Sequence, residues 1–284
     1  MKKVYNILNL SIIIFIFTGC NSFKSHAANV DTVSVTSTIM KKAIKNVVIY
    51  PNGNKSDHYP VLYLLHGYGG CYNSWIKRVP ELKTIADNNN IIIVCPDGAI
   101  SSWYVDSPID STMQYETYVS KELVAFIDQH YNTKNEGNKY RAISGFSMGG
   151  FGALFLALRH PDIFGACGSM SGALNLTHIK KNFDVNKSLG DTALNAKYYA
   201  DWSIINMLKN NPNIKTSMIL DCGREDFIFG MSKEANEKMI ELNIPHDYIE
   251  RPGKHDWKYW SNAIQYQVLF FRNYFNTNHS SNKS

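Results

Sequence analysis

The chain has 284 residues, of which 44% are hydrophobic, 13% aromatic and 19% charged, and its formal net charge is +5 at pH 7. This length accommodates one large α/β domain or two small ones, and the composition is that of a globular protein with a sizeable core. The basic residues are scattered and form no polybasic run or helical stripe, which excludes a nucleic-acid-binding protein on grounds of charge.

The N-terminal segment has the features of an export signal. Lys2 and Lys3 precede a hydrophobic stretch over residues 7–17. This stretch is shorter than the roughly 20 apolar residues that a helix needs to cross a bilayer. We therefore expect residues 1–19 to be a signal peptide.

The end of this segment indicates how the protein is anchored. Residues 17–20, Phe-Thr-Gly-Cys, resemble a bacterial lipobox, in which Cys20 is lipidated and becomes the first mature residue. Residues 20–35 would then form a flexible tether. The alternative is ordinary signal-peptidase cleavage near residues 25–27. We expect an outer-membrane or cell-surface lipoprotein of a bacterium, touching the membrane through this lipid only, or otherwise a periplasmic or secreted protein.

The other four cysteines are expected to be mostly free thiols, although export permits disulfides. Cys95 and Cys222 end strand-like runs and Cys167 follows a loop, where a small buried apolar side chain fits. Together with Cys71 they match no zinc-binding spacing and no dense disulfide framework. We expect neither a metal nor another cofactor.

From residue 36 the chain alternates between buried apolar runs and helical stretches. The expected strands are 47–50, 61–65, 91–95, 140–143, 166–170, 217–221 and 246–250, and the expected helices are 81–88, 116–130, 151–160, 233–243 and 259–274. Residues 51–60 are predicted to form a hairpin connection, and residues 175–213 a variable insertion that lids or walls a pocket. The pattern predicts one α/β domain over residues 36–276, with a mostly parallel sheet between helices, and a tail over 277–284.

Ser147 is the first candidate for chemistry. It lies in Gly-Phe-Ser-Met-Gly, residues 145–149, between an expected strand and an expected helix. A serine on such a turn is held in strained backbone geometry that lifts its hydroxyl clear of the sheet, and the glycines leave room for close approach. An ordinary turn serine is the alternative, so the rest of the chain must supply a base and an acid.

The base and the acid are expected after the last two strands, because ligands bind at the carboxyl ends of parallel strands. His255 lies in the loop before the closing helix, whereas His66 belongs to a turn motif and His160 ends a helix. For the acid we choose Asp226 over Asp221, which belongs to the strand end and could simply brace the loop. The order serine, aspartate, histidine is that of α/β-hydrolases.

An oxyanion formed at Ser147 would need preorganised N–H donors. One is expected from the backbone of Met148, directly after the serine. The second is expected from Tyr68 in His-Gly-Tyr-Gly-Gly, residues 66–70, where glycines let the backbone fold close to a substrate. A plain glycine-rich turn is the alternative, and a phosphate loop is disfavoured because no Gly-Lys-Ser/Thr follows.

Four motifs together resemble the putative-esterase family, which holds S-formylglutathione hydrolase (esterase D), bacterial feruloyl esterases and the antigen-85 mycolyltransferases. These motifs are YLLHGYGG with NSW behind it, SGFSMGGFGAL, DCGREDF and GKHDWKYW, and the match covers about residues 47–275. The resemblance, closest to exported feruloyl and acetyl esterases, implies an α/β-hydrolase fold. It also implies a triad of Ser147, Asp226 and His255, with Tyr68 and Met148 as oxyanion donors. The export signal, and the lack of a cysteine directly after HGY, make glutathione thioesters poor substrate candidates.

Four aromatic residues are candidates for binding the substrate: Trp103, Tyr104, Trp257 and Trp260. Aromatic faces stack on sugar rings and on phenolic rings alike, so they indicate a carbohydrate ester without choosing its acid. Packing beneath the loops is the alternative role, above all for the last two. We expect an exported serine carboxylesterase acting on small-molecule or oligosaccharide esters. An acyltransferase, a thioesterase and a non-catalytic binding module are the other possibilities.

Overall fold

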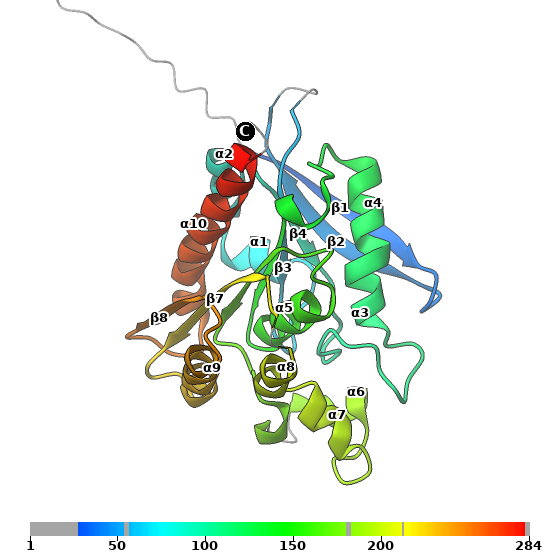
Figure 1. The fold of residues 1–284 in the computed structure, drawn as a ribbon. Coiled ribbons are helices and arrows are strands. Elements are labelled where there is room, and N and C mark those ends of the chain that lie inside the picture. Colours follow the sequence, from blue (N-terminus) through cyan, green and yellow to red (C-terminus); the bar gives the residue numbers. More distant parts are fainter. Residues whose placement is uncertain (1–27, 54–56, 180–182, 212, 282–284) are drawn as a thin grey trace, which may run out of the picture.

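A computed structural model of the chain describes residues 28–53, 57–179, 183–211 and 213–281 (Figure 1). Cys20 and the predicted signal peptide lie outside these residues, so export and lipidation stay predictions. In the described ranges no helix combines the length and the apolar character required to cross a membrane.

One eight-stranded sheet organises the molecule. Its strands are β1 (Asn29–Ser37), β2 (Lys42–Tyr50), β3 (Val61–Leu65), β4 (Ile92–Pro96), β5 (Arg141–Phe146), β6 (Ala166–Met170), β7 (Ser217–Gly223) and β8 (Asp247–Arg251). They lie in the order β1-β2-β4-β3-β5-β6-β7-β8. The contacts of β2 with β1 and β4 are antiparallel, and all the other neighbours are parallel. The mostly parallel sheet predicted from the continuous apolar runs is therefore confirmed.

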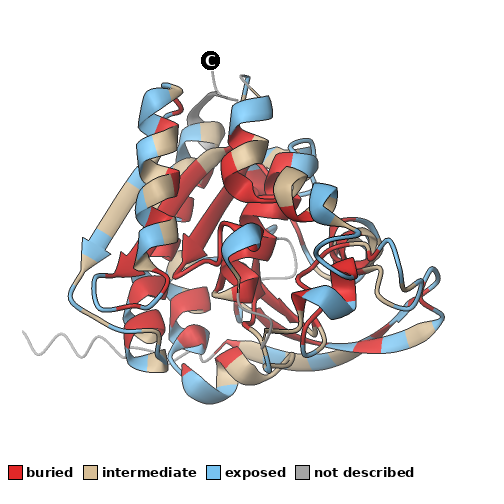
Figure 2. Cartoon of the chain, turned by 90° about the horizontal axis from the view of Figure 1, so that it is seen from below, coloured by how far each residue is buried: buried red, intermediate tan, exposed pale blue. Residues whose placement is uncertain are grey.

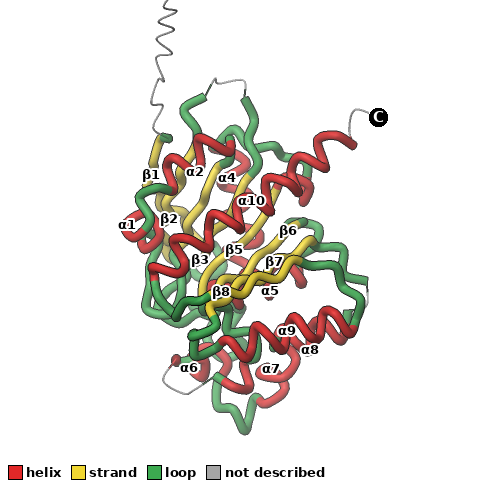
Figure 3. Tube along the Cα trace, turned by 90° about the vertical axis from the view of Figure 1, so that its left-hand side faces the viewer, coloured by secondary structure: helices red, strands yellow, loops and turns green. Residues whose placement is uncertain are grey.

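Helices cover both faces of this sheet (Figure 3). The helical segments are α1 (Ser74–Arg78), α2 (Leu82–Asn89), α3 (Tyr115–Thr117), the π-helical η1 (Tyr118–Leu123), α4 (Val124–His130), the 3₁₀ turn η2 (Gly137–Tyr140), α5 (Met148–Arg159), the 3₁₀ turn η3 (Leu176–His178), α6 (Val185–Leu189), α7 (Ala196–Asp201), α8 (Ile204–Asn210), α9 (Phe229–Glu241) and α10 (Trp257–Ser281). Side chains of α1, α2 and α10 form the core on one face. Those of α4, α5, α8 and α9 form the core on the other.

The central strands separate these two cores by alternation. Along β3, Leu62 and Leu64 point to one core, whereas Tyr63 and Leu65 point to the other. Every residue of β3 is buried, and the buried residues follow the sheet and the helix faces that pack on it (Figure 2). Both faces are covered by helices, which explains why a continuous apolar run is stable here as a strand.

The predicted tether is wrong in its second half, because residues 29–37 form β1. Valine and threonine, which favour strands, make up five of its nine residues, and burial alternates along it, so that one face lies toward the core. The predicted hairpin over residues 51–60 is also wrong, since β2 pairs with β1 and β4 and not with β3. The actual hairpin joins β1 to β2 and has Lys41 at a φ of 53° in its turn.

Candidate active site

Ser147 occupies a sharp turn between the end of β5 and the start of α5. Its backbone angles are φ 56° and ψ −120°, and its N–H donates to the carbonyl oxygen of Met170 on the neighbouring strand, at 3.0 Å. A left-handed φ at a residue with a Cβ costs about 1–3 kcal/mol and persists only where the surroundings impose it. The turn leaves the Ser147 side chain partly exposed, at the edge where the parallel strands end.

The glycines around Ser147 are required by close backbone contacts. A Cβ atom on Gly145 would lie 2.5 Å from the carbonyl oxygen of Gly149, and one on Gly149 would lie 2.6 Å from the carbonyl oxygens of Leu65 and His66. Any larger residue at either position would push α5 away from the strands. The Gly-x-Ser-x-Gly pattern therefore has a steric cause in this chain.

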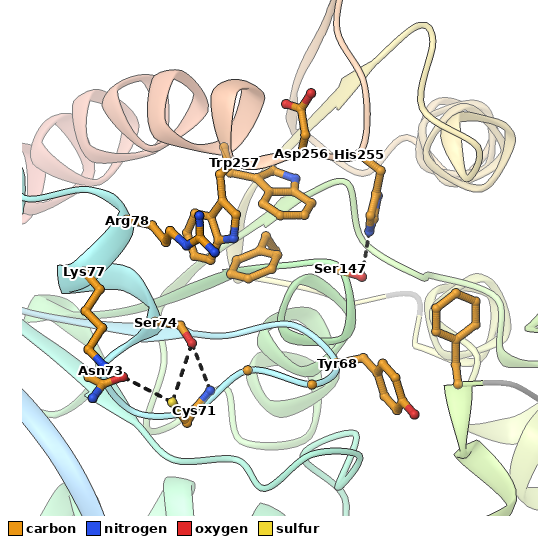
Figure 4. Close-up of a pocket in the computed structure, with 15 residues that line it drawn as sticks. Tyr68, Cys71, Asn73, Ser74, Lys77, Arg78, Ser147, His255, Asp256 and Trp257 are labelled. Carbon is orange, nitrogen blue, oxygen red and sulfur yellow. Dashed lines mark hydrogen bonds between the residues drawn. The ribbon is translucent and has the colours of Figure 1, made fainter.

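His255 and Asp226 complete a hydrogen-bonded chain with Ser147. The Ser147 hydroxyl lies 3.0 Å from Nε2 of His255, and Nδ1 of His255 lies 3.0 and 2.9 Å from the two carboxylate oxygens of Asp226. A carboxylate can only accept, so Nδ1 carries a proton and Nε2 is free to accept from the serine. Figure 4 shows His255 pointing at Ser147 across the cleft. This arrangement can remove the serine proton and hold the resulting imidazolium.

Asp221, the rival acid, is engaged elsewhere. Its buried carboxylate accepts from the guanidinium of Arg251, at 2.8 and 3.1 Å, and from the hydroxyl of Tyr259. Burial raises the pKa of Asp221 above its ordinary value, although the Tyr259 hydroxyl and Arg251 act against this shift. Asp221 therefore joins the ends of β7 and β8 to the start of α10, and the structure places Asp226 beside His255.

Backbone hydrogen bonds join the loop that carries Asp226 to the loop that carries His255. The N–H of Arg224 donates to the carbonyl of Arg251 at 2.8 Å, and the N–H of Glu225 donates to the carbonyl of Gly253 at 3.0 Å. The two loops therefore continue the pairing of β7 with β8. This pairing sets the distance between the carboxylate and the imidazole.

The two predicted oxyanion donors lie on either side of Ser147. Met148 begins α5, so its N–H has no carbonyl within the helix to bond to. The loop of residues 66–70 approaches from β3, and a Cβ on Gly67 would lie 3.2 Å from the Cβ of Ser147. Neither the N–H of Tyr68 nor that of Met148 donates to a backbone acceptor in the described part of the chain.

His66 holds this loop in place, and both of its ring nitrogens are engaged by backbone groups of Gly67 and Gly98 and not by the residues of the proton chain. Its Nδ1 donates to the carbonyl of Gly67 and its Nε2 accepts from the N–H of Gly98, both at 2.8 Å. Burial lowers the pKa of His66, which keeps the imidazole neutral, as this pairing requires. The hydroxyl of Tyr104, a buried residue, donates to the carbonyl of His66 at 3.0 Å and so helps to fix the loop.

A cleft of about 640 Å³ opens beside Ser147, and two of the four predicted aromatic residues line it, Trp257 and Trp260. The other two do not, so the prediction is wrong for them. Tyr104 is fully buried, and Trp103 is 2% exposed, packs on Phe151 and donates its indole N–H to a carbonyl of the insertion. Both have a positive φ, which turns the chain inward at this point.

Several cleft residues were missed by the sequence analysis. Phe227 does not line the cleft but stands beside it: the residue is 64% exposed, and the centroid of its ring lies 4.6 Å from that of His255. It follows Asp226 in the chain, a signal that could have been used. Phe183 lines the cleft from the insertion, and the neighbouring Asp184 accepts from the hydroxyl of Tyr68 at 3.0 Å. The insertion thus walls the cleft. Lys77 and Arg78, at the end of α1, also line it and carry no sequence signal of their own.

The cysteines lie where the sequence places them. Cys95, Cys167 and Cys222 are buried free thiols, and burial raises the pKa of each well above its usual range. Cys71 is also a free thiol but is partly exposed in the cleft, where its Sγ lies 3.2 Å from Oδ1 of Asn73. The thiol most accessible to reagents in the described chain therefore lines the same cleft as Ser147.

Comparison with known proteins shows that this chain is similar to esterases and to acyltransferases. The family model described as "Putative esterase" matches residues 37–271. The chain is 27% identical over 230 residues to an acetyl esterase of Caldicellulosiruptor saccharolyticus, covering 74% of this chain and 82% of that one. It is 26% identical over 283 residues to a diacylglycerol acyltransferase/mycolyltransferase Ag85A of Mycobacterium gordonae, covering 86% and 80%. Among solved structures, a ferulic acid esterase superposes with a TM-score of 0.76 at 26% identity, covering 88% of this chain and 99% of that chain.

Proposed function

We propose that this chain, a carboxylic ester hydrolase that belongs to the putative esterase family, cleaves acyl esters of carbohydrates through an acyl-enzyme on Ser147. The observation that carries the proposal is the continuous chain from the Ser147 hydroxyl through His255 to Asp226, with spacings of 3.0 and 2.9 Å. A serine hydroxyl is a poor nucleophile until such a base removes its proton.

The reaction follows from this geometry in two halves. Oγ of Ser147 attacks the ester carbonyl carbon while its proton passes to Nε2 of His255. The oxyanion so formed accepts from the N–H groups of Tyr68 and Met148, each of which lowers the barrier by about 3 to 4 kcal/mol. His255 then returns the proton to the leaving alcohol oxygen, and an acyl group stays on Ser147.

Water completes the second half. His255 removes a proton from a water molecule, whose oxygen attacks the acyl carbon, and the tetrahedral species collapses to release the acid and restore the serine hydroxyl. Asp226 stays ionised throughout and stabilises the imidazolium that forms twice in each cycle.

The aromatic walls of the cleft support a carbohydrate ester. Trp257 offers a partly exposed ring to the cleft, Phe183 lines the cleft from the insertion, and the ring of Phe227 stacks on Phe183 and lies beside His255. Such faces stack on sugar rings and on aromatic acyl groups. Relatives named acetyl esterase and ferulic acid esterase favour an acetyl or feruloyl group as the acyl portion. We place the enzyme outside the cytoplasm, as a lipoprotein anchored through Cys20.

The proposal is tested by measuring initial rates of the purified protein on p-nitrophenyl acetate, methyl hydroxycinnamates, and acetylated and feruloylated oligosaccharides. We expect hydrolysis that Ser147→Ala abolishes, with the oligosaccharide esters preferred over the simple ones. Equal rates for the variant would overturn the role of Ser147. A preference for simple alkyl esters would overturn the carbohydrate assignment.

Acyl transfer is the second candidate, because the mycolyltransferase relative matches 86% of the chain. The same acyl-enzyme would then be attacked by a sugar hydroxyl in place of water. Product analysis in the presence of a mono- or disaccharide acceptor distinguishes the two activities. Transfer that exceeds hydrolysis in dilute acceptor would make the protein an acyltransferase.

A further inference from the structure

The cleft continues past the reaction centre to the end of α1. Beyond Ser147 and His255 it is lined by polar residues of the 71–74 segment and then by Lys77 and Arg78, whose side chains are exposed. In Figure 4 these two cations lie on the far side of the cleft from Ser147, and Arg78 extends from the helix into it. The cleft is therefore aromatic beside the serine and cationic at its far end.

Neither cation has an acidic partner in the part of the chain that the structure describes. Among the described residues, no carboxylate lies within ion-pair distance of Lys77 or Arg78. Asp256 is the one acidic residue on the described cleft wall, and its Oδ1 accepts the N–H of Tyr259 at 2.9 Å to cap the start of α10. Its carboxylate points away from the cleft in Figure 4. The positive charge at the end of α1 is available to a ligand.

The position of His255 indicates which part of an ester reaches these cations. Its Nε2 must protonate the leaving oxygen, so the alcohol portion lies along the wall formed by His255, Trp257 and Trp260. Trp257 packs against Trp75 of α1, with ring centroids 5.3 Å apart, and the same short helix ends in Lys77 and Arg78. We propose that the cleft selects esters whose alcohol portion carries a negative charge, such as the carboxylate of an acidic sugar, and that Lys77 and Arg78 bind this charge. The inference rests on the proposed ester hydrolysis.

The effect should be modest and sensitive to salt. Both side chains are exposed, and exposed ion pairs each contribute at most about fivefold. Arg78 can hold a carboxylate with two parallel hydrogen bonds, whereas Lys77 acts as a point charge. Together they should favour an anionic alcohol over a matched neutral one by about tenfold, equivalent to about 1.4 kcal/mol.

The test compares kcat/KM for 4-acetoxybenzoate and for its methyl ester, two acetyl esters that differ in one charge on the alcohol portion. In Lys77→Gln/Arg78→Gln the ratio of anionic to neutral substrate should fall about tenfold relative to wild type. Dividing the two ratios cancels the different intrinsic reactivity of the esters. The matched control is Lys83→Gln/Lys121→Gln, which removes two exposed cations outside the cleft and should leave the ratio as in wild type.

Salt gives a second readout that needs no substitution. Raising NaCl from about 0.02 M to about 0.5 M shortens the Debye length to roughly 4 Å and should lower the ratio in wild type, but not in Lys77→Gln/Arg78→Gln. Single substitutions, Lys77→Gln and Arg78→Gln, replace the double variant if it does not fold.

Each outcome bears on the inference. A ratio unchanged in the cleft variant, or lowered equally in the control, overturns the charge selection while ester hydrolysis stands. The acyl side is tested by comparing kcat/KM for 4-nitrophenyl succinate, whose acyl group is anionic, with that for 4-nitrophenyl butyrate, whose acyl group is neutral. If Lys77→Gln/Arg78→Gln changes only this ratio, the assignment to the alcohol side is overturned. If wild type hydrolyses neither acetyl ester, and behaves as Ser147→Ala does on every ester tested, the proposed function and the inference both fail.

Discussion

Replacing Asp226 by asparagine tests the proton chain directly, because the structure predicts which carboxylate oxygen the new amide nitrogen would replace. Oδ1 of Asp226 accepts the N–H of Ile228 at 3.0 Å, so the carbonyl oxygen of an asparagine would stay at that position. The amide nitrogen would then stand in place of Oδ2, 2.9 Å from Nδ1 of His255. A donor there favours the tautomer with its proton on Nε2, which cannot accept the proton of Ser147.

The expected loss is large and confined to turnover. Wrong-tautomer substitutions in other triads reduce kcat roughly 10⁴-fold, which corresponds to about 5.4 kcal/mol of barrier. Asp226→Asn keeps the size of the side chain and one of its hydrogen bonds, so the folded structure should be retained. Stopped-flow and steady-state release of p-nitrophenol should show both acylation and kcat reduced, with a melting temperature close to that of wild type.

Asp221→Asn is the matched control. It makes the same chemical change in a carboxylate that bonds to Arg251 and Tyr259 and not to His255. It removes the charge that Arg251 faces. Breaking a fully buried pair costs about 3–5 kcal/mol, and the cost here should be at or below the lower end because the Arg251 side chain is 22% exposed. We expect the melting temperature of this variant to fall by several degrees or more, and its kcat at low temperature to stay near that of wild type. Near-normal turnover in Asp226→Asn, together with a 10⁴-fold loss in Asp221→Asn, would refute the reasoning.

Three further predictions follow from other parts of the chain. Ser147→Ala should lower ester hydrolysis by several orders of magnitude and leave circular dichroism unchanged, and substantial residual activity would argue against a covalent mechanism. Cys20→Ala should abolish lipid labelling and release the protein from the membrane fraction, and an equally membrane-bound variant would contradict lipidation. Burial raises the pKa of Glu116, but hydrogen bonds from His160 and Arg159 outweigh it and hold the pKa below its ordinary value of 4.5. The stability that this carboxylate contributes is present above pH 4.5 and is lost as the pH falls through its lower pKa in the folded state. In urea unfolding, Glu116→Gln should therefore lose less free energy of unfolding between pH 7 and pH 3 than wild type does. An equal loss in the two proteins would contradict this.

Much of the architecture could be predicted because parallel strands leave a local signal. Runs such as residues 61–65 are apolar at every position, and only a strand covered on both faces explains this. The candidate residues Ser147, Asp226 and His255 were placed after three different strands, and the structure brings them within hydrogen-bonding distance. Strand order was harder: the hairpin at residues 51–60 looked local, but β2 pairs across the sheet with β4.

The direction of a single side chain in a loop was not predictable. Trp103 and Tyr104 follow a strand end, as cleft residues should, yet their positive φ angles turn both rings into the core. Phe227 could have been proposed from its place next to Asp226, but only the tertiary structure shows that its ring is exposed beside His255. Sequence periodicity reports burial over many residues, whereas a loop residue is placed by contacts that come from distant segments.

The cleft divides between segments that serve chemistry and segments that serve recognition. Ser147, Asp226 and His255 all follow strands of one sheet, so their mutual distances are set by the pairing of β5 to β8 and by the loop contacts that extend it. The cleft's other walls come from α1 and from the 175–213 insertion, neither of which pairs with the sheet. Changes in those walls can alter which ester binds without moving the proton chain, because in the described residues the ring of His255 is hydrogen-bonded to Asp226 and Ser147 and not to the walls. Substitutions at Lys77, Arg78 and Phe183 should therefore change the ratio of kcat/KM between different esters. Substitutions at the strand ends should lower kcat/KM for all esters by a similar factor.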